Sequence, residues 1–302
     1  MMRPFFHACL TCLLSLDATI AADDPDGGMR AIPLKRVINK VQPMTGIVLW
    51  DTSEHNATDA IQLEYSYMRY SDVVSRRGEY DWGIVEKKLD AIAGRGHQAV
   101  MRFYFVYPGN PTTVPDYIKH LSDYQETTAK SERKDTGFPD WSHPELKRFV
   151  MEFQTRLAER YDKDPRLAFL QTGFGLWAEY HIYDGPFKLG GTFPDKEFQA
   201  EFLKHMASTF HDTPWSISVD AVDDRVSPIK RNAALLGLPF GVFDDSFLCK
   251  QHKIENELNW NAMDRKRYLD APAGGEFSYY NKRDQKLALA ADGPNGVPFE
   301  NA

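Results

Sequence analysis

The chain has 302 residues, of which 42% are hydrophobic and 26% charged, and its formal net charge is -7. This hydrophobic content supports one large buried core and excludes an intrinsically disordered chain. The acidic balance, without any block of Lys and Arg, argues against electrostatic binding of nucleic acid or of an anionic membrane. We therefore expect a neutral or mildly charged ligand.

Residues 1–22 have the pattern of a secretory signal peptide. Arg3 is followed by an apolar stretch at 5–16, and small residues then precede an acidic segment. The apolar stretch is shorter than the roughly 20 residues that a membrane-spanning helix needs. The pattern predicts a secreted or periplasmic protein, without a membrane partner after signal cleavage, whose mature domain spans 23–302.

From residue 46 onward, strand-like runs alternate with amphipathic helices, which is typical of βα units around a parallel sheet. Most runs are nearly continuously apolar or aromatic, as expected for strands covered on both faces. The predicted strands are GIVLWD (46–51), AIQLEYSYMRY (60–70), AVMRFYFVY (99–107), LAFLQTGF (167–174), WSISVDA (215–221), FGVFDD (240–245) and GGEFSYY (274–280).

Three longer helices are predicted between these strands, at 81–93, 142–161 and 196–210, each with apolar side chains at helical spacing. Ser142, followed three residues later by Glu145, predicts a capping box at the start of the second helix. The apolar stripes of these helices indicate core contacts and carry no functional interpretation.

Seven strands with intervening helices predict an α/β fold, a (β/α)8 TIM-type barrel that is incomplete. No eighth strand with a closing helix can be recognised after Glu276. Because an unclosed barrel exposes a strand edge, we expect this chain to be a C-terminally truncated copy of a barrel. The stretch 108–141 lacks a regular pattern and follows the third strand, so it is expected to be an irregular loop that shapes the pocket.

Catalytic groups of such a barrel stand at the C-terminal ends of its strands, which makes a carboxylate just past a strand a good candidate. Glu179 lies in QTGFGLWAEYHIYDG, where glycines let the backbone approach a ligand and Trp177, Tyr180 and His181 supply flat faces and polar tips. Sugars bind such surfaces through their apolar faces and their hydroxyls. An apolar setting would also keep Glu179 protonated as a general acid.

Glycosidase chemistry needs two carboxyls, and their separation decides whether one attacks the sugar or activates water. Glu276 lies on the seventh predicted strand, so a barrel would bring it to the same mouth as Glu179. Arg102 is a cation within the apolar run VMRFYF and must therefore be paired. A carboxylate of the barrel mouth is its expected partner, and a purely structural ion pair is the alternative. We predict Glu179 and Glu276 as the catalytic pair.

Asp220, Asp244 and Asp245 could bind sugar hydroxyls, form a second acid–base pair or hold a cation. No H-x-H or H-E-x-x-H array accompanies them, so neither a metal nor another cofactor is predicted. The residues predicted to bind the carbohydrate substrate are Arg102, Trp177, Tyr180, His181, Asp220, Asp244, Asp245 and Tyr279.

Six segments carry a resemblance to known proteins: GIVLWD, LEYSYMRY, FPDW, GFGLWAEYHIYDGPF, FDDSF and PAGGEFSYYNKRDQ. They resemble a family of secreted bacterial barrel proteins whose domain has no assigned function. The run from MRYSDVV to VMRF is similar to the second and third βα units of clan A glycoside hydrolases. That likeness implies that Glu179 is the acid/base of the fourth strand and Glu276 the nucleophile of the seventh. Ala178 stands where clan A enzymes usually have Asn, so the usual partner of the sugar 2-hydroxyl is absent.

The sequence therefore predicts a glycoside hydrolase that acts on a poly- or oligosaccharide through a Glu/Glu pair. One alternative is a non-catalytic carbohydrate-binding barrel, which Ala178 and the missing eighth strand favour. The other is a metal-dependent hydrolase built on Asp220, Asp244 and Asp245.

Overall fold

The computed structural model describes residues 44–247, 249, 251–264, 266–269, 271–277, 282, 283 and 286. The predicted signal peptide at 1–22 and the predicted substrate-binding residue Tyr279 lie outside these ranges. Within them, every helix is too short or too polar to cross a membrane.

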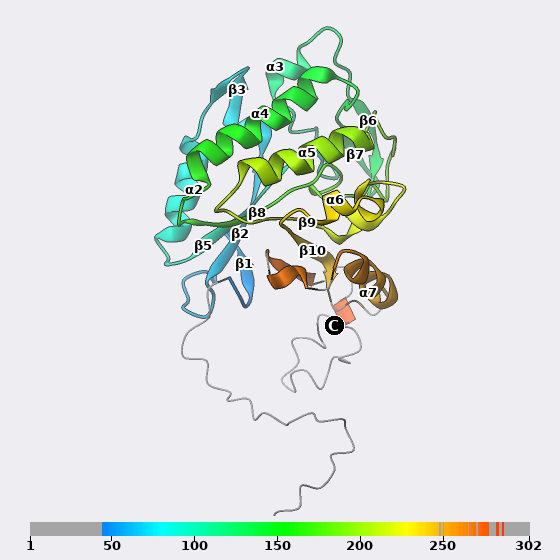
Figure 1. Ribbon diagram of the computed structural model, residues 1–302. Helices are drawn as coiled ribbons and strands as arrows, with labels where there is room; N and C mark the ends of the chain where they lie inside the picture. The colour runs from blue at the N-terminus through cyan, green and yellow to red at the C-terminus, as the bar shows by residue number, and fades with distance from the viewer. Residues whose placement is uncertain are drawn as a thin grey trace, which may run out of the picture. The chain divides into compact units, whose positions relative to one another are not determined.

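A seven-stranded parallel sheet is the main element of the described chain (Figure 1). Its strands lie side by side in the order in which they occur in the sequence, and each neighbouring pair is parallel. They are β1 (Val48–Trp50), β2 (Leu63–Arg69), β5 (Gln98–Tyr104), β8 (Leu167–Gln171), β9 (Trp215–Ser218), β10 (Phe240–Phe247) and β11 (Ala273–Phe277). All seven predicted strands are thus present, but β1, β2, β5, β8 and β9 end earlier than predicted, and residues 278–280 are not described.

The sheet is strongly curled, as is shown by contacts between side chains of distant strands on its inner face. Strands β5 and β11 are four positions apart, which in a flat sheet would be about 19 Å at the usual strand spacing. Arg102 on β5 nevertheless contacts Glu276 on β11 at 3.3 Å. Its guanidinium carbon also lies 4.2 Å from the ring centroid of Phe243 on β10. The sheet therefore has the form of an incomplete barrel, with β1 and β11 as its two outer strands.

Helices cover the outer face of the sheet, and Figure 1 shows α4 and α5 side by side. The helices are α1 (Tyr70–Val73), α2 (Gly83–Ala93), α3 (Asp116–Lys119), α4 (Pro144–Tyr161), α5 (Lys196–Thr209), α6 (Ala233–Leu236) and α7 (Lys253–Ala262). The three predicted helices correspond to α2, α4 and α5. Their expected apolar stripes are buried.

The predicted start of α4 was wrong. The helix begins at Pro144, and its N-cap is His143, whose ring Nδ1 accepts a hydrogen bond from the Glu145 N–H at 3.2 Å. Ser142 instead donates from both its N–H and its hydroxyl to Asp140. Pro fits the first helical position, where no N–H is needed.

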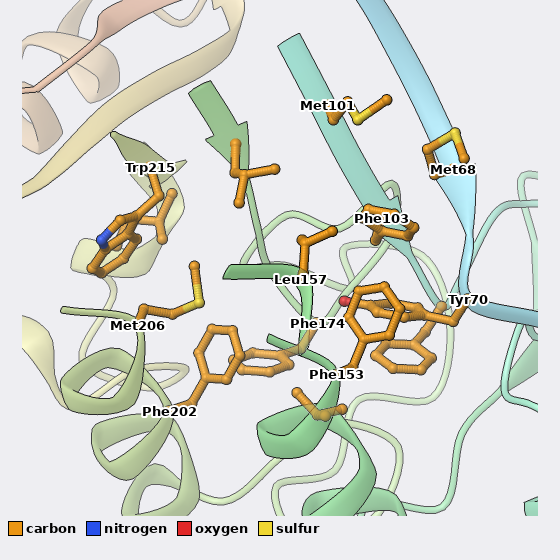
Figure 2. Close-up of a cluster of buried hydrophobic side chains, with 14 of the residues drawn as sticks. Met68, Tyr70, Met101, Phe103, Phe153, Leu157, Phe174, Phe202, Met206 and Trp215 are labelled. Atoms are coloured by element: carbon orange, nitrogen blue, oxygen red, sulfur yellow. The ribbon is translucent and has the colours of Figure 1, made fainter. Parts of the chain in front are cut away.

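Buried aromatic and sulfur-containing side chains fill the layer between sheet and helices (Figure 2). Phe153 of α4 packs edge-on against Phe103 of β5 and against Tyr70, each at a ring separation of 4.9 Å. Phe202 of α5 contacts Phe174 in the same way, also at 4.9 Å. These contacts hold the two long helices onto the sheet.

The inner face of the sheet changes from apolar to polar along β2, β5 and β8. A small buried cluster lies toward the strand starts and consists of Leu63, Tyr65, Val100, Ala168 and Phe169. Two residues further on, the same face presents Tyr67, Arg102 and Gln171, which lie opposite one another in register. Alternate residues of a strand share one face, so the sequence pattern places these three polar side chains, here called the polar row, next to the apolar cluster on the inner face.

The stretch 108–141 is more regular than predicted. It contains α3 and an antiparallel hairpin of β6 (Thr127–Ser131) and β7 (Lys134–Phe138). A two-residue turn joins these strands, and both of its residues, Glu132 and Arg133, have left-handed φ values of 50° and 62°. The turn lacks the Asn-Gly or Asp-Gly signal of such hairpins, which explains why the sequence did not reveal it. A second hairpin joins β3 (Val74–Arg76) to β4 (Glu79–Tyr80).

Replacing Phe153 by Ala should lower the free energy of unfolding by about 3–5 kcal/mol, because it leaves a cavity among packed rings. Urea unfolding followed by far-UV circular dichroism measures this change. Glu159→Ala on the exposed side of the same helix is the control and should cost about 0.5 kcal/mol or less. Equal losses in the two variants would contradict the proposed packing.

Candidate active site

Arg102 occupies the centre of the polar row and is fully buried. Burying a cation is costly unless it is paired and hydrogen-bonded, and here every guanidinium nitrogen has a partner. The acceptors are Gln171 Oε1 at 3.0 Å, Tyr67 Oη at 3.0 Å, the Trp177 carbonyl at 3.2 Å, Glu179 Oε1 at 3.0 Å and Glu276 Oε1 at 3.3 Å. The predicted pairing of Arg102 with a carboxylate is therefore present, with two carboxylates in place of one.

Glu179 is only 2% exposed. Its Oε1 accepts the hydrogen bond from Arg102, whereas its buried Oε2 receives none from the described residues. Burial raises the pKa of Glu179 well above its ordinary value, and the negative charges of Asp245, Asp220 and Glu276 raise it further against the opposing effect of Arg102. Asp245 is the largest of these charge effects. Burial and the neighbouring negative charges thus both favour the protonated form of Glu179.

Glu276, on β11, is more open, because one third of its side chain is exposed. Burial still raises its pKa, and so does Asp245, while Arg102 lowers it. Glu179 and Glu276 bind different terminal nitrogens of the same guanidinium. The fourth and seventh strands of the sheet therefore bring their carboxyl groups to one site, as a curled sheet of parallel strands predicts.

His181 lies beside Glu179 in a second polar chain. Its Nδ1 is 3.1 Å from Asp220 Oδ2 and 3.5 Å from Glu179 Oε2. Burial favours the neutral ring, but Asp220 and Asp245 outweigh it and raise the pKa of His181 above its ordinary value. Asp220 also accepts a hydrogen bond from the Ser218 hydroxyl at 3.1 Å. Burial disfavours its ionisation, but His181 and Ser218 hold the pKa of Asp220 below the usual value.

The loop that carries Glu179 has a tight and strained backbone. Trp177 and Ala178 both adopt left-handed φ values, 53° and 60°, a conformation that costs free energy for residues other than glycine. Hydrogen bonds fold the loop back on itself, from Gly175 N–H to the Glu179 carbonyl at 2.7 Å and from Glu179 N–H to the Leu176 carbonyl at 2.9 Å. A Cβ on Gly175 would lie 2.0 Å from the His181 carbonyl oxygen. The glycines of the motif are therefore required by close backbone packing.

Two of the predicted substrate-binding residues do not face the site. Tyr180 is fully buried in the core, where its ring contacts Phe174 and Phe193, so a sugar cannot reach it. Asp244 is 2% exposed and accepts hydrogen bonds from the Ser246 N–H and hydroxyl, both at 2.9 Å. Successive residues of a strand point to opposite faces, so Asp245 faces the site and its neighbour does not.

Sequence reasoning missed Tyr67, Gln171 and Ser218. Tyr67 and Gln171 hydrogen-bond Arg102 from the two adjacent strands, and Ser218 both supports Asp220 and accepts a hydrogen bond from the Tyr180 N–H at 2.9 Å. Gln171 is the one polar residue in the strand LAFLQ, which is a usable signal. Tyr67 could be recognised only after the register with Arg102 was known.

One group within the described ranges has the composition of a metal site. Glu179, His181 and Asp220 each offer a ligand atom, and these atoms lie within 4.8 Å of one another. The alternative cluster of Asp220, Asp244 and Asp245 is not formed, because Asp244 points away. The prediction that the protein uses no metal remains a prediction.

No family model matches the sequence, and no curated protein matches it. The likeness to a family of secreted barrel proteins therefore stays a prediction. Among solved structures, the chain is similar to GH5_18 from Streptomyces cattleya in complex with GlcNAc, with 12% identity, 64% of this chain and 44% of that chain covered, and a TM-score of 0.43.

Two further similar structures are endo-glycoceramidase II from Rhodococcus sp. and xylanase XynB from Paenibacillus barcinonensis. Both are 12% identical with a TM-score of 0.42, and the alignments cover 70% and 71% of this chain and 56% and 61% of those chains. The chain thus spans about half the length of the structures it matches. Because TM-scores below 0.5 and identities this low carry no functional argument, function is inferred from the side chains of the site.

The raised pKa of Glu179 predicts how the free energy of unfolding depends on pH. Between the ordinary pKa of 4.5 and the higher folded value, the folded state binds a proton that the unfolded chain has lost, so stability falls as pH rises. Glu179→Gln removes this loss. The variant should therefore gain unfolding free energy relative to the parent above about pH 4.5, by up to about 1.4 kcal/mol per pH unit.

Urea unfolding at a series of pH values measures this difference. The control is Glu201→Gln, at an exposed position of α5, which should follow the parent at every pH. A constant difference between Glu179→Gln and the parent across the pH series would contradict a buried, protonated Glu179.

Proposed function

We propose that the protein is a glycoside hydrolase in which Glu179 is the general acid and base and Glu276 is the nucleophile. The observation that carries the proposal is that two carboxyl groups, from the fourth and seventh strands of a curled parallel sheet, hydrogen-bond one buried guanidinium. Glycoside hydrolysis needs two such carboxyl groups on either side of the scissile bond.

The surroundings of the two carboxyl groups support different roles for them. Glu179 is buried beside Asp220 and Asp245, which favours the protonated form that an acid needs. Glu276 is one third exposed, so its ionised form is penalised less by burial than that of Glu179, and Arg102 Nη2 at 3.3 Å opposes the remaining rise of its pKa. Pairs of carboxyl groups with unequal environments are the usual sign of divided acid and nucleophile roles.

We propose a retaining mechanism for this pair. Retaining enzymes hold their carboxyl groups about 5–5.5 Å apart, whereas inverting enzymes leave about 6.5–9.5 Å for a water molecule. The contacts of Glu179 and Glu276 with one guanidinium place both carboxyl groups in one site, and the likeness of the sequence to clan A glycoside hydrolases, which implies a nucleophile on the seventh strand, supports retention.

In this mechanism Glu276 attacks the anomeric carbon while Glu179 gives its proton to the leaving oxygen. Water then attacks the anomeric carbon and gives a proton to Glu179, while the bond between the sugar and Glu276 breaks. This step restores both carboxyl groups to their starting states. Arg102 would orient both carboxyl groups throughout. Asp220 and Asp245 would favour the protonated state of Glu179, and these two residues together with His181 would bind sugar hydroxyls.

We further propose that the curled sheet is part of a (β/α)8 barrel and that the protein is exported. The parallel order of the strands supports the first proposal, and the pattern of residues 1–22 supports the second. Membership of the family of secreted barrel proteins is proposed on the sequence motifs alone.

A metal-dependent hydrolase is the second candidate, since Glu179, His181 and Asp220 could together bind a divalent cation. Prolonged dialysis against a chelator separates the two proposals. Activity that is lost on dialysis and restored by a divalent cation would favour the metal-dependent enzyme, whereas unchanged activity supports the glycosidase with two carboxyl groups.

Glu179→Gln should lower kcat by about 10²–10⁴-fold on glycosides with a poor leaving group, because the proton donor is lost. Aryl glycosides with an acidic leaving group need less proton donation, so their glycosylation step should be affected less. Glu276→Gln should abolish turnover of both kinds of substrate. The measurement is the initial rate of aryl-alcohol release from aryl glycosides and of reducing-sugar release from oligosaccharides. Glu201→Gln is the control. Undiminished hydrolysis by either site variant would refute the assignment.

The stereochemical outcome tests the proposed separation of the two carboxyl groups. The first sugar product should have the same anomeric configuration as the substrate, because two successive displacements occur at the anomeric carbon. Proton NMR spectra recorded before mutarotation report this configuration. An inverted product would show that Glu276 activates water and does not attack the sugar.

A further inference from the structure

A row of aromatic rings leads away from the carboxyl pair. Tyr107, which follows β5, makes edge-on contacts with Tyr67 at 6.2 Å and with Trp177 at 6.3 Å between ring centroids. Trp177 and Tyr183 lie in nearly parallel planes, 21° apart, at 6.1 Å. The row therefore begins at Tyr67, a hydrogen-bond partner of Arg102, and ends at Tyr183.

The outer rings of this row are accessible. Tyr107 is 36% exposed and Tyr183 is 63% exposed, whereas the core rings Phe103, Phe153 and Phe174 are buried. Tyr183 also lies 5.3 Å from the ring of His181, whose Nδ1 is 3.5 Å from the Glu179 carboxyl. The exposed rings are thus continuous with the proposed catalytic groups.

The hairpin β6–β7 holds Tyr183 in place. The Tyr183 hydroxyl donates to Glu132 Oε1 at 2.6 Å, and the Glu132 N–H donates to Asp184 Oδ2 at 2.6 Å. Glu132 belongs to the left-handed turn of the hairpin, so a structured element outside the main sheet fixes an exposed ring beside the site. A ring fixed before binding loses little conformational freedom when a ligand arrives.

We propose that Tyr107, Trp177 and Tyr183 form a subsite for an additional sugar unit, next to the unit that the carboxyl pair acts on. This subsite rests on the proposed function. A protein with such a subsite would act on a neutral oligo- or polysaccharide and not on the glycoside of a single sugar. Aromatic faces bind the apolar faces of sugar rings, and the phenolic and imidazole groups nearby can bind hydroxyls. Glu132 is a positioning residue that acts through Tyr183.

The test uses Glu179→Gln as the background, so that ligands bind without being consumed. Isothermal titration with di-, tri- and tetrasaccharides of the β-1,4-linked gluco, xylo and manno series gives affinity as a function of chain length. Affinity should rise with length for at least one series, and Tyr183→Ala should remove most of that gain, about tenfold. Tyr183→Phe keeps the ring and should keep most of the gain.

Tyr268→Ala is the matched control, since Tyr268 is 64% exposed and lies in a different part of the chain. Glu132→Ala should produce a smaller loss than Tyr183→Ala, and only for the longer ligands. Absence of binding by every ligand, equal affinity at every length, or an equal loss for the shortest ligand in Tyr183→Ala would overturn the subsite.

Hydrolysis by the parent chain is measured separately on the same ligands. Binding that depends on chain length and on Tyr183, without release of reducing sugar, would support the subsite and refute the proposed hydrolase. Hydrolysis that depends on Glu179 but not on Tyr183 would support the hydrolase and refute the subsite.

Discussion

The buried guanidinium of Arg102 is the group on which the arrangement of the inner face depends. It is fully enclosed, and it reaches the second, fourth and seventh strands of the sheet through Tyr67, Gln171 and Glu276. A buried charge is tolerated only where its hydrogen bonds are complete, so these contacts constrain how far the sheet can open. The same contacts bring two carboxyl groups together that would repel one another without the cation between them.

The outer face of the sheet provides apolar packing that stabilises the fold, whereas the inner face carries the polar groups of the proposed site. Met101 and Phe103 belong to the buried cluster of the outer face, where Phe103 contacts Phe153 of α4, while their neighbours Val100 and Arg102 face inward. The register of β2, β5 and β8 places the inward-facing Tyr67, Arg102 and Gln171 at the same level. The buried polar and charged side chains, which are costly to remove from water, are thus confined to the inner face. Apolar packing on the outer face offsets this cost in folding free energy.

Much of this arrangement can be predicted from sequence, because it depends on patterns that local residues carry. The apolar runs predicted all seven strands, and the unpaired cation in VMRFYF predicted an ion pair that is present. Side-chain direction was harder to predict. Tyr180 follows the turn at Trp177 and Ala178, where side-chain direction depends on φ values that the residue types do not reveal. Asp244 lies on β10 beside Asp245, and alternation along the strand directs only one of these two side chains to the site.

Capping and long-range contacts were the other limits. His143 serves as an N-cap although its side chain is not among the usual capping types, and Ser142 was preferred for its residue type alone. Tyr67 becomes recognisable only through the pairing of β2 with β5, which are distant in sequence. The Glu132–Arg133 turn lacks a glycine or asparagine, so a structured hairpin was taken for an irregular loop.

The attachment of Tyr183 to the hairpin has a consequence for how such a protein can change over evolutionary time. Glu179 is held by buried backbone hydrogen bonds and by glycines that tolerate no side chain, whereas Tyr183 is held by hydrogen bonds at the exposed tip of a separate hairpin. Insertions or substitutions at that tip leave the sheet and its polar layer untouched. Descendants of this chain could therefore diverge in the ligands they prefer while inheriting the same central chemistry.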